Sequence, residues 1–363
     1  EGLGRSGPRR AEARVRPEAV RSGLLAALLA LALGVAAPAA RSQEGTLLVV
    51  NRHSQAGSVS FFDLATETEI ARIPVGPGWP HEVAVAPNGR LALTAEYGEE
   101  TPGRRVVLID IPGARVLGSI DMGPGSRPHD AAFLPDNRHA VVTLETRDEL
   151  AVVDVETFSV VRTYPIGEAA REGHMFRLSP AGDRVYVGGR LGAGTVSVVY
   201  LDEDREPTVI QTGLGAEAIA VTPDGASVWV INQDENTISI IDPVSLVEVE
   251  KFDAATQPRR LANLPGGRMA VVYGNRDTAG IRIFDTRTRE TLHDVPIPGD
   301  GVGAGGFGFV AVGNTGFVST RLDGRILVYD FAAPTVPPRT LAAGHETPDG
   351  MNWTPLRVNA FNR

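Results

Sequence analysis

The sequence predicts an all-β, seven-bladed β-propeller whose ring is closed by pairing the C-terminal strand with the first blade. The main support is a repeat of 40 to 48 residues within the 363-residue chain. A fixed period in this range is typical of propellers, in which each repeat forms one blade of four strands. Every repeat contains an apolar run ending in aspartate, at Asp63, Asp110, Asp154, Asp202, Asp242, Asp285 and Asp330.

The repeat around residues 217–252 shows the expected strand order most clearly. Four apolar-alternating segments follow one another: EAIAVT, SVWVIN, TISIID and VEVEKF. A TPDG turn and polar loops separate them, as expected for strands joined by tight turns. Because valine, isoleucine and aromatic residues dominate these segments, strands are favoured over helices.

The first blade lacks an innermost strand of its own. Residues 46–51 (TLLVVN) already align with the second strand of the other repeats, whereas TPDGMNWTPL near the C-terminus aligns with WPHEVAVAPN of the second blade. In this alignment Pro348 matches Pro80 and Pro355 matches Pro87. We therefore predict that the last strand pairs beside residues 46–51 and removes two open sheet edges.

The units TISIIDPVSLVEV and IPVGPGWPHEVAVAPNG resemble the YVTN-type 40-residue propeller repeat of YncE-like exported proteins. The resemblance covers about residues 44–355. It implies the fold but no single activity, because similar propellers serve as scaffolds, surface-layer proteins, lactonases and redox enzymes.

The beginning of the chain is interpreted as a targeting segment. Arginines precede an apolar run from Leu24 to Ala37, followed by an A-x-A-type cleavage site at Ala37-Pro38-Ala39. This 14-residue run is shorter than the roughly 20 residues of a membrane span. We expect residues 1–43 to be a cleaved signal peptide and n-region. Residues 44–363 should form a single propeller, monomeric and without a membrane span, in the bacterial periplasm or outside the cell.

Charge and composition restrict the partners. The net charge is −9, and residues 1–40 carry six Arg and three Glu, which leaves the remainder near −12. Such an acidic surface argues against nucleic acid as a partner. The absence of cysteine excludes disulfides, thiolate nucleophiles, Fe–S clusters and covalent haem within this sequence.

Candidate functional residues gather at one end of the central channel, which we call the channel mouth. The residue after the aligned proline begins the innermost strand of each blade, giving Asp349, His81, His129, His174, Glu217, Arg259 and Gly308. The next positions are Gly350, Glu82, Asp130, Met175, Ala218, Arg260 and Phe309. Loops between second and third strands open on the same face and add Asn51, His53, Glu96, Tyr97, Glu145, Arg190, Asn232, Asn275 and Arg321. Five of the seven histidines map there: His53, His81, His129, His174 and His345.

Two interpretations of the histidines remain open. His81, His129 and His174, with a carboxylate from the same end, are suitable ligands for a divalent transition metal such as Zn²⁺ or Cu²⁺. The carboxylate would come from Glu217, Glu82 or Asp130. Alternatively, these side chains hydrogen-bond neighbouring blade backbones at a solvated channel mouth.

The adjacent Arg259 and Arg260 also allow two interpretations. Guanidinium groups can hold the carboxylate or phosphate of a small ligand. They can equally form ion pairs with Glu217 and the other acids of the ring.

The function expected from these features is that of an exported binding or scaffold module. Its ligand, a small molecule or a protein, would bind His81, His129, His174, Glu217, Arg259, Asp349, Glu82 and Asp130 at the channel mouth. The alternative is a metal- or histidine-dependent enzyme, such as a lactonase, lyase or other hydrolase, that uses the same residues.

If residues 1–43 are an export signal, the exported protein begins between about Ala40 and Glu44, because signal peptidases cut after small residues. Intact-mass measurement of protein recovered from the periplasm or medium checks this. A chain that keeps its arginine-rich start in the cytoplasm contradicts it.

Overall fold

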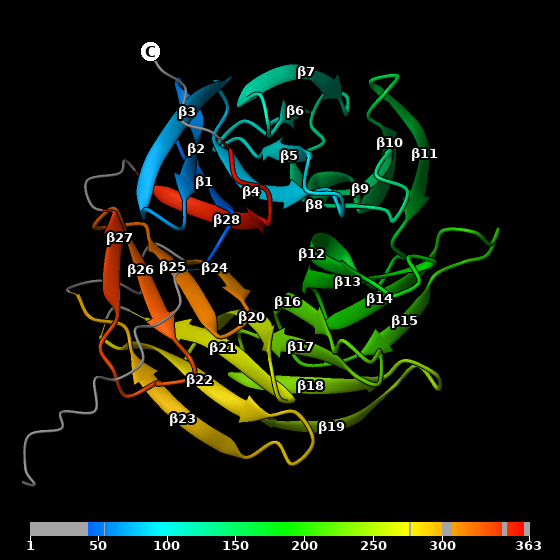
Figure 1. Cartoon of the computed structure of the whole chain (residues 1–363). Helices are drawn as coiled ribbons and strands as arrows, with labels where there is room; N and C mark the ends of the chain where they lie inside the picture. Colours follow the sequence, from blue (N-terminus) through cyan, green and yellow to red (C-terminus); the bar gives the residue numbers. More distant parts are fainter. Residues whose placement is uncertain (1–42, 54, 276, 300–306, 343–346, 359–363) are drawn as a thin grey trace, which may run out of the picture. The chain divides into compact units, whose positions relative to one another are not determined.

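Seven four-stranded sheets form a ring around a central axis in the computed structural model (Figure 1). The structure describes residues 43–53, 55–275, 277–299, 307–342 and 347–358. The predicted seven-bladed propeller is confirmed. The predicted signal segment up to residue 42 and His345 lie outside the described residues. Among those described, no helix is long and apolar enough to cross a membrane.

Each blade runs antiparallel from an innermost to an outermost strand. Blade 1 is β28 (Pro348–Thr354), β1 (Thr46–Asn51), β2 (Gly57–Asp63) and β3 (Thr68–Gly76), and blade 2 is β4 (Pro80–Val85), β5 (Leu91–Glu96), β6 (Arg105–Asp110) and β7 (Arg115–Asp121). Blade 3 is β8 (Pro128–Phe133), β9 (His139–Leu144), β10 (Glu149–Asp154) and β11 (Ser159–Pro165), with the 3-10 turn η1 (Glu145–Arg147) between β9 and β10. Blade 4 is β12 (Arg171–Leu178), β13 (Arg184–Leu191), β14 (Thr195–Tyr200) and β15 (Thr208–Gln211), and blade 5 is β16 (Ala216–Val221), β17 (Val228–Asn232), β18 (Thr237–Asp242) and β19 (Val247–Asp253). Blade 6 is β20 (Pro258–Leu264), β21 (Arg268–Gly274), β22 (Ala279–Asp285) and β23 (Thr291–Pro296), and blade 7 is β24 (Phe307–Val312), β25 (Thr315–Thr320), β26 (Arg325–Asp330) and β27 (Arg339–Ala342).

The C-terminal strand closes the ring as predicted. β28 pairs antiparallel with β1, with Thr354 opposite Thr46 and Met351 opposite Val49. The Thr354 hydroxyl also donates to the carbonyl of Gly89 at 2.9 Å, which ties the closing strand to blade 2. Blade 1 is therefore assembled from both ends of the propeller sequence.

The repeated aspartate has a local structural cause. It ends the third strand in every blade but blade 4, and in five of the seven repeats its carboxylate accepts a hydrogen bond from a backbone N–H two residues later, as in an Asx turn. Donor–acceptor distances are 2.9 Å for Asp154, 2.7 Å for Asp242 and 2.8 Å for Asp285. This turn leads the chain into the outermost strand, which explains why the aspartate marks the repeat.

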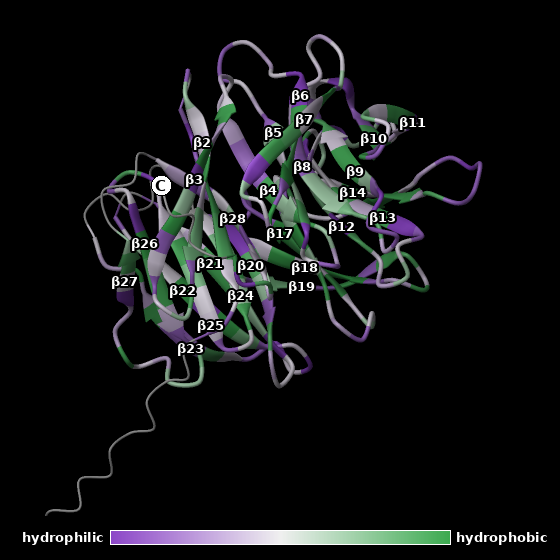
Figure 2. Cartoon of the chain, turned by 45° about the horizontal axis from the view of Figure 1, so that its top comes forward, coloured by the Kyte–Doolittle hydropathy of each residue, from purple (hydrophilic) through white to green (hydrophobic). Residues whose placement is uncertain are grey.

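The hydrophobic cores lie between neighbouring blades. Side chains alternate along a strand, so Leu47 of β1 packs toward blade 7 and Leu48 toward blade 2. Figure 2 shows the hydrophobic residues concentrated in the strands, while the connecting loops are mostly hydrophilic. Each blade is thus stabilised by both neighbours, and an open ring would expose two such faces.

Deleting residues 348–363 is expected to destabilise the whole propeller by more than about 5 kcal/mol. The deletion removes the buried Met351, worth about 2–5 kcal/mol by itself, together with the pairing of β1. Urea unfolding monitored by circular dichroism measures the loss. A chain ending at Val358, which keeps β28, is the control and should match the full protein. Equal midpoints for both truncations would argue against closure by β28.

Candidate functional site at the channel mouth

The side chains at the channel mouth come from β-bulges at the start of the innermost strands. In β4, His81 and Glu82 lie between the paired residues Pro80 and Val83, whereas the partner strand β5 offers a single residue, Ala95. Equivalent register shifts occur in five further blades, at residues 129–130, 174–175, 217, 259 and 349–350. An extra residue re-aims the side chains next to it, so consecutive residues can both face the axis.

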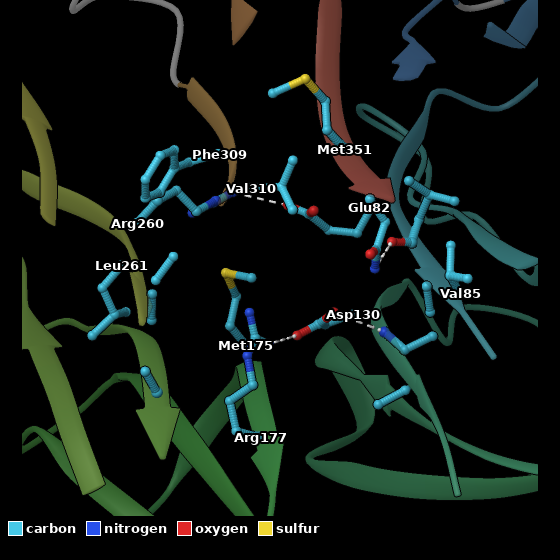
Figure 3. A pocket seen from close by; sticks show the side chains of 18 of the residues that line it. Glu82, Val85, Asp130, Met175, Arg177, Arg260, Leu261, Phe309, Val310 and Met351 are labelled. Atoms are coloured by element: carbon cyan, nitrogen blue, oxygen red, sulfur yellow. Dashed lines mark hydrogen bonds and ion pairs between the residues drawn. The ribbon is translucent and has the colours of Figure 1, made fainter. Parts of the chain in front are cut away.

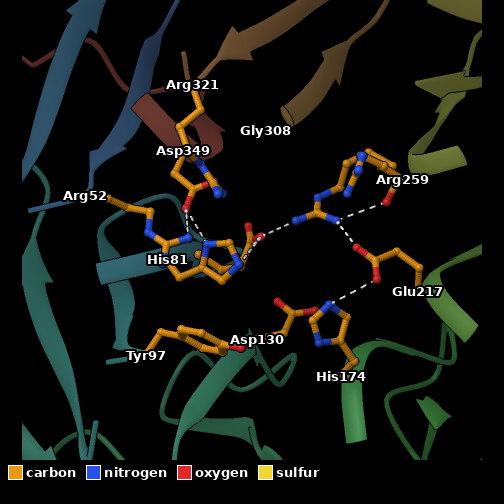
Figure 4. A network of polar contacts seen from close by, with 12 residues as sticks. Arg52, His81, Tyr97, Asp130, His174, Glu217, Arg259, Gly308, Arg321 and Asp349 are labelled. Carbon is orange, nitrogen blue, oxygen red and sulfur yellow. Dashed lines mark hydrogen bonds and ion pairs between the residues drawn. The ribbon is translucent and has the colours of Figure 1, made fainter. Parts of the chain in front are cut away.

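Most of the predicted residues are buried, contrary to the solvated channel mouth that one interpretation expected, whereas Glu82 and Arg259 are partly exposed. His129 is 0% exposed, Asp349 1% and His174 5%. Together with Glu145 they belong to what we call the axial cluster, which consists of His81, Glu82, His129, Asp130, Glu145, His174, Glu217, Arg260 and Asp349. Figure 4 shows most of these side chains converging from several blades.

Asp349 organises one side of the axial cluster. Its carboxylate is hydrogen-bonded to Nδ1 of His81 and accepts from Arg52 at 3.2 Å and from Arg321 at 2.5 Å (Figure 4). Burial opposes ionisation of this carboxyl, but His81 and Arg321 outweigh it and hold its pKa well below the usual range. The residue that closes the ring is therefore also the anion that binds three neighbouring side chains.

The imidazoles of His129 and His174 stack on the other side. Their ring centroids are 3.9 Å apart, and that of His81 lies 4.7 Å from His129. Nε2 of His174 lies 3.4 Å from a Glu217 oxygen, and Nδ1 lies 3.7 Å from Oε2 of Glu145. Glu145 begins η1 of blade 3, and one of its carboxylate oxygens lies within 4.8 Å of a ring nitrogen of each imidazole.

Ion pairs link the axial cluster across the channel. Arg260 donates to Glu82 at 2.9 Å and to Glu217 at 3.3 Å, which connects blades 2, 5 and 6. Arg190 lies 3.4 Å from Glu217. The ion-pair interpretation is therefore correct for Arg260. It is wrong for Arg259, whose guanidinium forms no ion pair with a described residue and contacts Gln257 at 3.4 Å. The place of Arg259 in the ligand-binding ring stays a prediction.

Below the axial cluster a cavity of about 520 Å³ follows the channel (Figure 3). Its wall includes short alanine and valine side chains of the innermost strands, together with Met175 and Met351. Asp130, which accepts from Arg177 at 3.1 Å, lies at its polar end with Arg260. The mouth residues thus form a buried polar layer above a partly apolar channel.

The two stacked imidazoles have opposite proton affinities. Burial lowers the pKa of His129 far below its ordinary value, and the positive charges of His174 and His81 lower it further. Burial also disfavours the charged form of His174, but Glu217 and Glu145 outweigh that effect and raise its pKa to about 9. At neutral pH and without a bound metal, His129 is therefore a neutral imidazole beside a protonated His174.

Several of the loop residues join the site and others do not. Tyr97 donates to Glu145 at 3.3 Å, and Arg190 and Arg321 pair with cluster carboxylates. His53 is exposed, and its ring accepts hydrogen bonds from its own loop. Glu96 pairs with Arg105, a residue of its own blade.

Three arginines at or near the site were missed by sequence reasoning: Arg52, Arg127 and Arg177. Arg52 and Arg127 lie over the ring of Tyr97, at 5.8 and 5.1 Å from its centroid. Arg127 directly precedes the aligned Pro128, so extending the alignment by one position was the available signal. Arg52 follows the end of the second strand, as Tyr97, Glu145 and Arg321 do in their blades, so the same loop alignment could have found it. Arg177 lies at a position of the innermost strand where blades 2 and 3 have alanine, so the repeat gave no signal for it.

The family model described as "Lactonase, 7-bladed beta-propeller" matches residues 105–293, just over half of the chain. The chain belongs to this lactonase family of seven-bladed β-propellers. The matched region contains His129, Glu145, His174 and Glu217, whereas His81 and Asp349 lie outside it.

Hydrazine synthase subunit beta of Kuenenia stuttgartiensis is 23% identical over 227 residues. The match covers 51% of this chain and 58% of that protein, so the chain spans less than two thirds of this relative.

Solved structures share the fold. The structure titled Kuenenia stuttgartiensis Hydrazine Synthase matches with a TM-score of 0.60 at 19% identity, over 69% of this chain and 76% of the other. A functionally unknown protein of Desulfotomaculum acetoxidans gives 0.67 at 18% identity, over 85% and 99%. The periplasmic gluconolactonase PpgL of Pseudomonas aeruginosa gives 0.66 at 16% identity, over 87% and 99%. At these identities the likeness shows the fold alone.

The raised pKa of His174 predicts a pH-dependent stability. Because the pKa is about 9 in the folded chain and 6.5 when unperturbed, the contribution is complete below pH 6.5 and is lost as pH rises through 9. Its size is on the order of 2–3 kcal/mol. Urea midpoints of the chelator-treated wild type should fall over this interval, and those of His174→Gln should fall less. Parallel curves for the two proteins contradict the prediction.

Proposed function

We propose that the chain hydrolyses the ring ester of a small lactone at the channel mouth. The observation that carries the proposal is a set of guanidinium groups with unused donors around the axial cluster. The Nε–H groups of Arg52, Arg127, Arg259 and Arg321 are buried and have no acceptor among the described residues. Such donors suit carboxylate oxygens and the oxyanion that forms when an ester carbonyl is attacked.

The family supports an ester as the substrate, since its name is that of a lactonase and one structural neighbour is titled a gluconolactonase. Ring opening converts a neutral ester into a carboxylate, so negative charge develops where arginines are available. Arg52 and Arg321 are already paired with Asp349, whereas the one side chain among the described residues that accepts a hydrogen bond from Arg259 is Gln257. We therefore assign Arg259 to the lactone carbonyl oxygen and the Asp349-bound arginines to its orientation.

A second candidate is a binding module without turnover, located in the periplasm or outside the cell. One comparison favours it, because the curated relative is by name a subunit of hydrazine synthase. On this alternative the same face binds a protein partner. The two candidates differ in whether purified chain alone opens lactones.

The test uses a panel of γ- and δ-lactones of neutral and acidic sugar acids, followed through acid release with a pH indicator. Wild type should open at least one of them above the uncatalysed rate. Arg259→Gln should reduce kcat/KM by about 100-fold, the usual effect of removing one oxyanion donor. Arg115→Gln is the matched control, because Arg115 is 69% exposed and pairs with Asp110 in a turn on the opposite face.

Absence of turnover by wild type across the panel overturns the enzymatic proposal and leaves the binding module. Turnover that Arg259→Gln does not alter places the reaction elsewhere on the propeller. Equal losses in both variants would indicate a general charge effect instead of a role for Arg259.

A further inference from the structure

Three buried side chains at the channel mouth bring potential metal ligands together. A nitrogen of His129, a carboxylate oxygen of Glu145 and a nitrogen of His174 all lie within 4.8 Å of one another. The residues come from β8, η1 and β12, and their exposures are 0%, 2% and 5%. The bulges of blades 3 and 4 aim both histidines at this point.

The atoms that face one another are those without a hydrogen-bond partner. Both ring nitrogens of His129, Nδ1 of His174 and Oε2 of Glu145 are buried, and none makes a hydrogen bond to a described residue. Nδ1 of His174 and Oε2 of Glu145 face each other at the ion-pair distance of 3.7 Å. Buried polar atoms are normally paired, because leaving one unpaired costs free energy. Their convergence therefore indicates one bound group that contacts all three side chains.

The other polar atoms of His174 and Glu145 contact side chains outside this group of three residues. Nε2 of His174 lies 3.4 Å from Glu217, which leaves Nδ1 turned toward Glu145. The hydroxyl of Tyr97 donates to Oε1 of Glu145 at 3.3 Å and leaves Oε2 unused. Outer partners of this kind orient the ligands of metal sites in proteins.

We propose that His129, Glu145 and His174 bind one divalent transition metal ion, with zinc as the best fit. Two imidazoles and one carboxylate are a common zinc donor set, and they leave a fourth position for water. Tetrahedral ligands about 2.1 Å from zinc are about 3.4 Å apart. The distance from Nδ1 of His174 to Oε2 of Glu145 is 3.7 Å, close to that spacing. Nitrogen donors argue against magnesium and calcium, which prefer oxygen.

This ligand set differs from the one expected from the sequence. His81, the third histidine of that set, uses Nδ1 to bind Asp349, and Glu145 takes its place. Glu217 and Arg260 already form an ion pair, as do Glu82 and Arg260, so those carboxylates hold neighbours. The inference stands apart from lactone hydrolysis, although a metal-bound water would suit that reaction.

The experiment uses full-length protein without a polyhistidine tag, treated with EDTA and then titrated with Zn²⁺ or Co²⁺. We expect one equivalent of zinc by elemental analysis and a visible Co²⁺ spectrum typical of four-coordinate sites. Glu145→Gln and His174→Gln should each weaken binding by at least 100-fold. His139→Gln and His293→Gln are matched controls outside the axial cluster and should keep both the stoichiometry and the spectrum. His81→Gln tests the ligand set expected from the sequence and should also keep the metal.

Each outcome either supports or overturns the metal site. No stoichiometric metal in wild type overturns the site, and so does equal weakening in the control variants. Loss of metal in His81→Gln but not in Glu145→Gln restores the set expected from the sequence and refutes this one. Circular dichroism separates misfolding from lost ligands, and Glu145→Gln, which keeps the side-chain volume, decides if a histidine variant does not fold. Metal binding without lactone turnover refutes the proposed function and leaves this inference intact.

Discussion

The pairing of β28 with β1 is the constraint on which the fold and the channel mouth both depend. A linear array of blades would expose an apolar face at each end, and this pairing buries both. The same strand carries Asp349, the anion that binds His81, Arg52 and Arg321. Ring closure and completion of the polar layer are thus one event. A propeller that opens at this seam loses one side of its candidate site.

The second constraint is the bulge at the start of the innermost strands. A regular strand directs successive side chains to opposite faces, toward the two neighbouring blades. Because of the extra residue, the side chains of both His81 and Glu82 can face the channel axis. Hydroxyl groups of the second strand fix this geometry, since Thr94 donates to the carbonyl of Glu82 and Thr143 accepts from the backbone of Asp130. Blade 7 has no such shift, and its position in the ring is occupied by Gly308.

The fold was predictable because each feature of the repeat follows from interactions between residues that are close in the sequence. The aspartate of five repeats caps a turn, alternation places valine and isoleucine between blades, and the proline before His81 recurs before Asp349. The site was predictable only as a set of aligned positions. Alignment placed His129, His174 and Glu217 at one end, but it carried no information on which atoms would pair. It placed Arg259 in the ligand-binding ring and left Arg260 out, whereas their separate partners depend on a one-residue bulge. Glu145 was named among loop residues, but its nearness to His129 and His174 depends on the η1 turn, which the alignment did not predict.

Backbone strain and buried charge, both of which cost folding free energy, are concentrated at the channel mouth. Trp79, Arg127, Gln257 and Thr347 each precede a proline and have positive φ, between 45° and 53°. Neither feature is usual for residues with a side chain, and strain of this kind gathers at functional sites. In the same layer lie buried carboxylates, guanidinium groups and a charged imidazole, whose desolvation is repaid only when geometry and hydrogen bonds are good. Apolar residues of similar size would fill this layer without the desolvation cost of buried charges, as they do between the blades. The combination of strain, buried charge and unpartnered donors in one layer therefore supports our proposal that this layer serves a ligand, and the seven apolar interfaces provide the stability that maintains it.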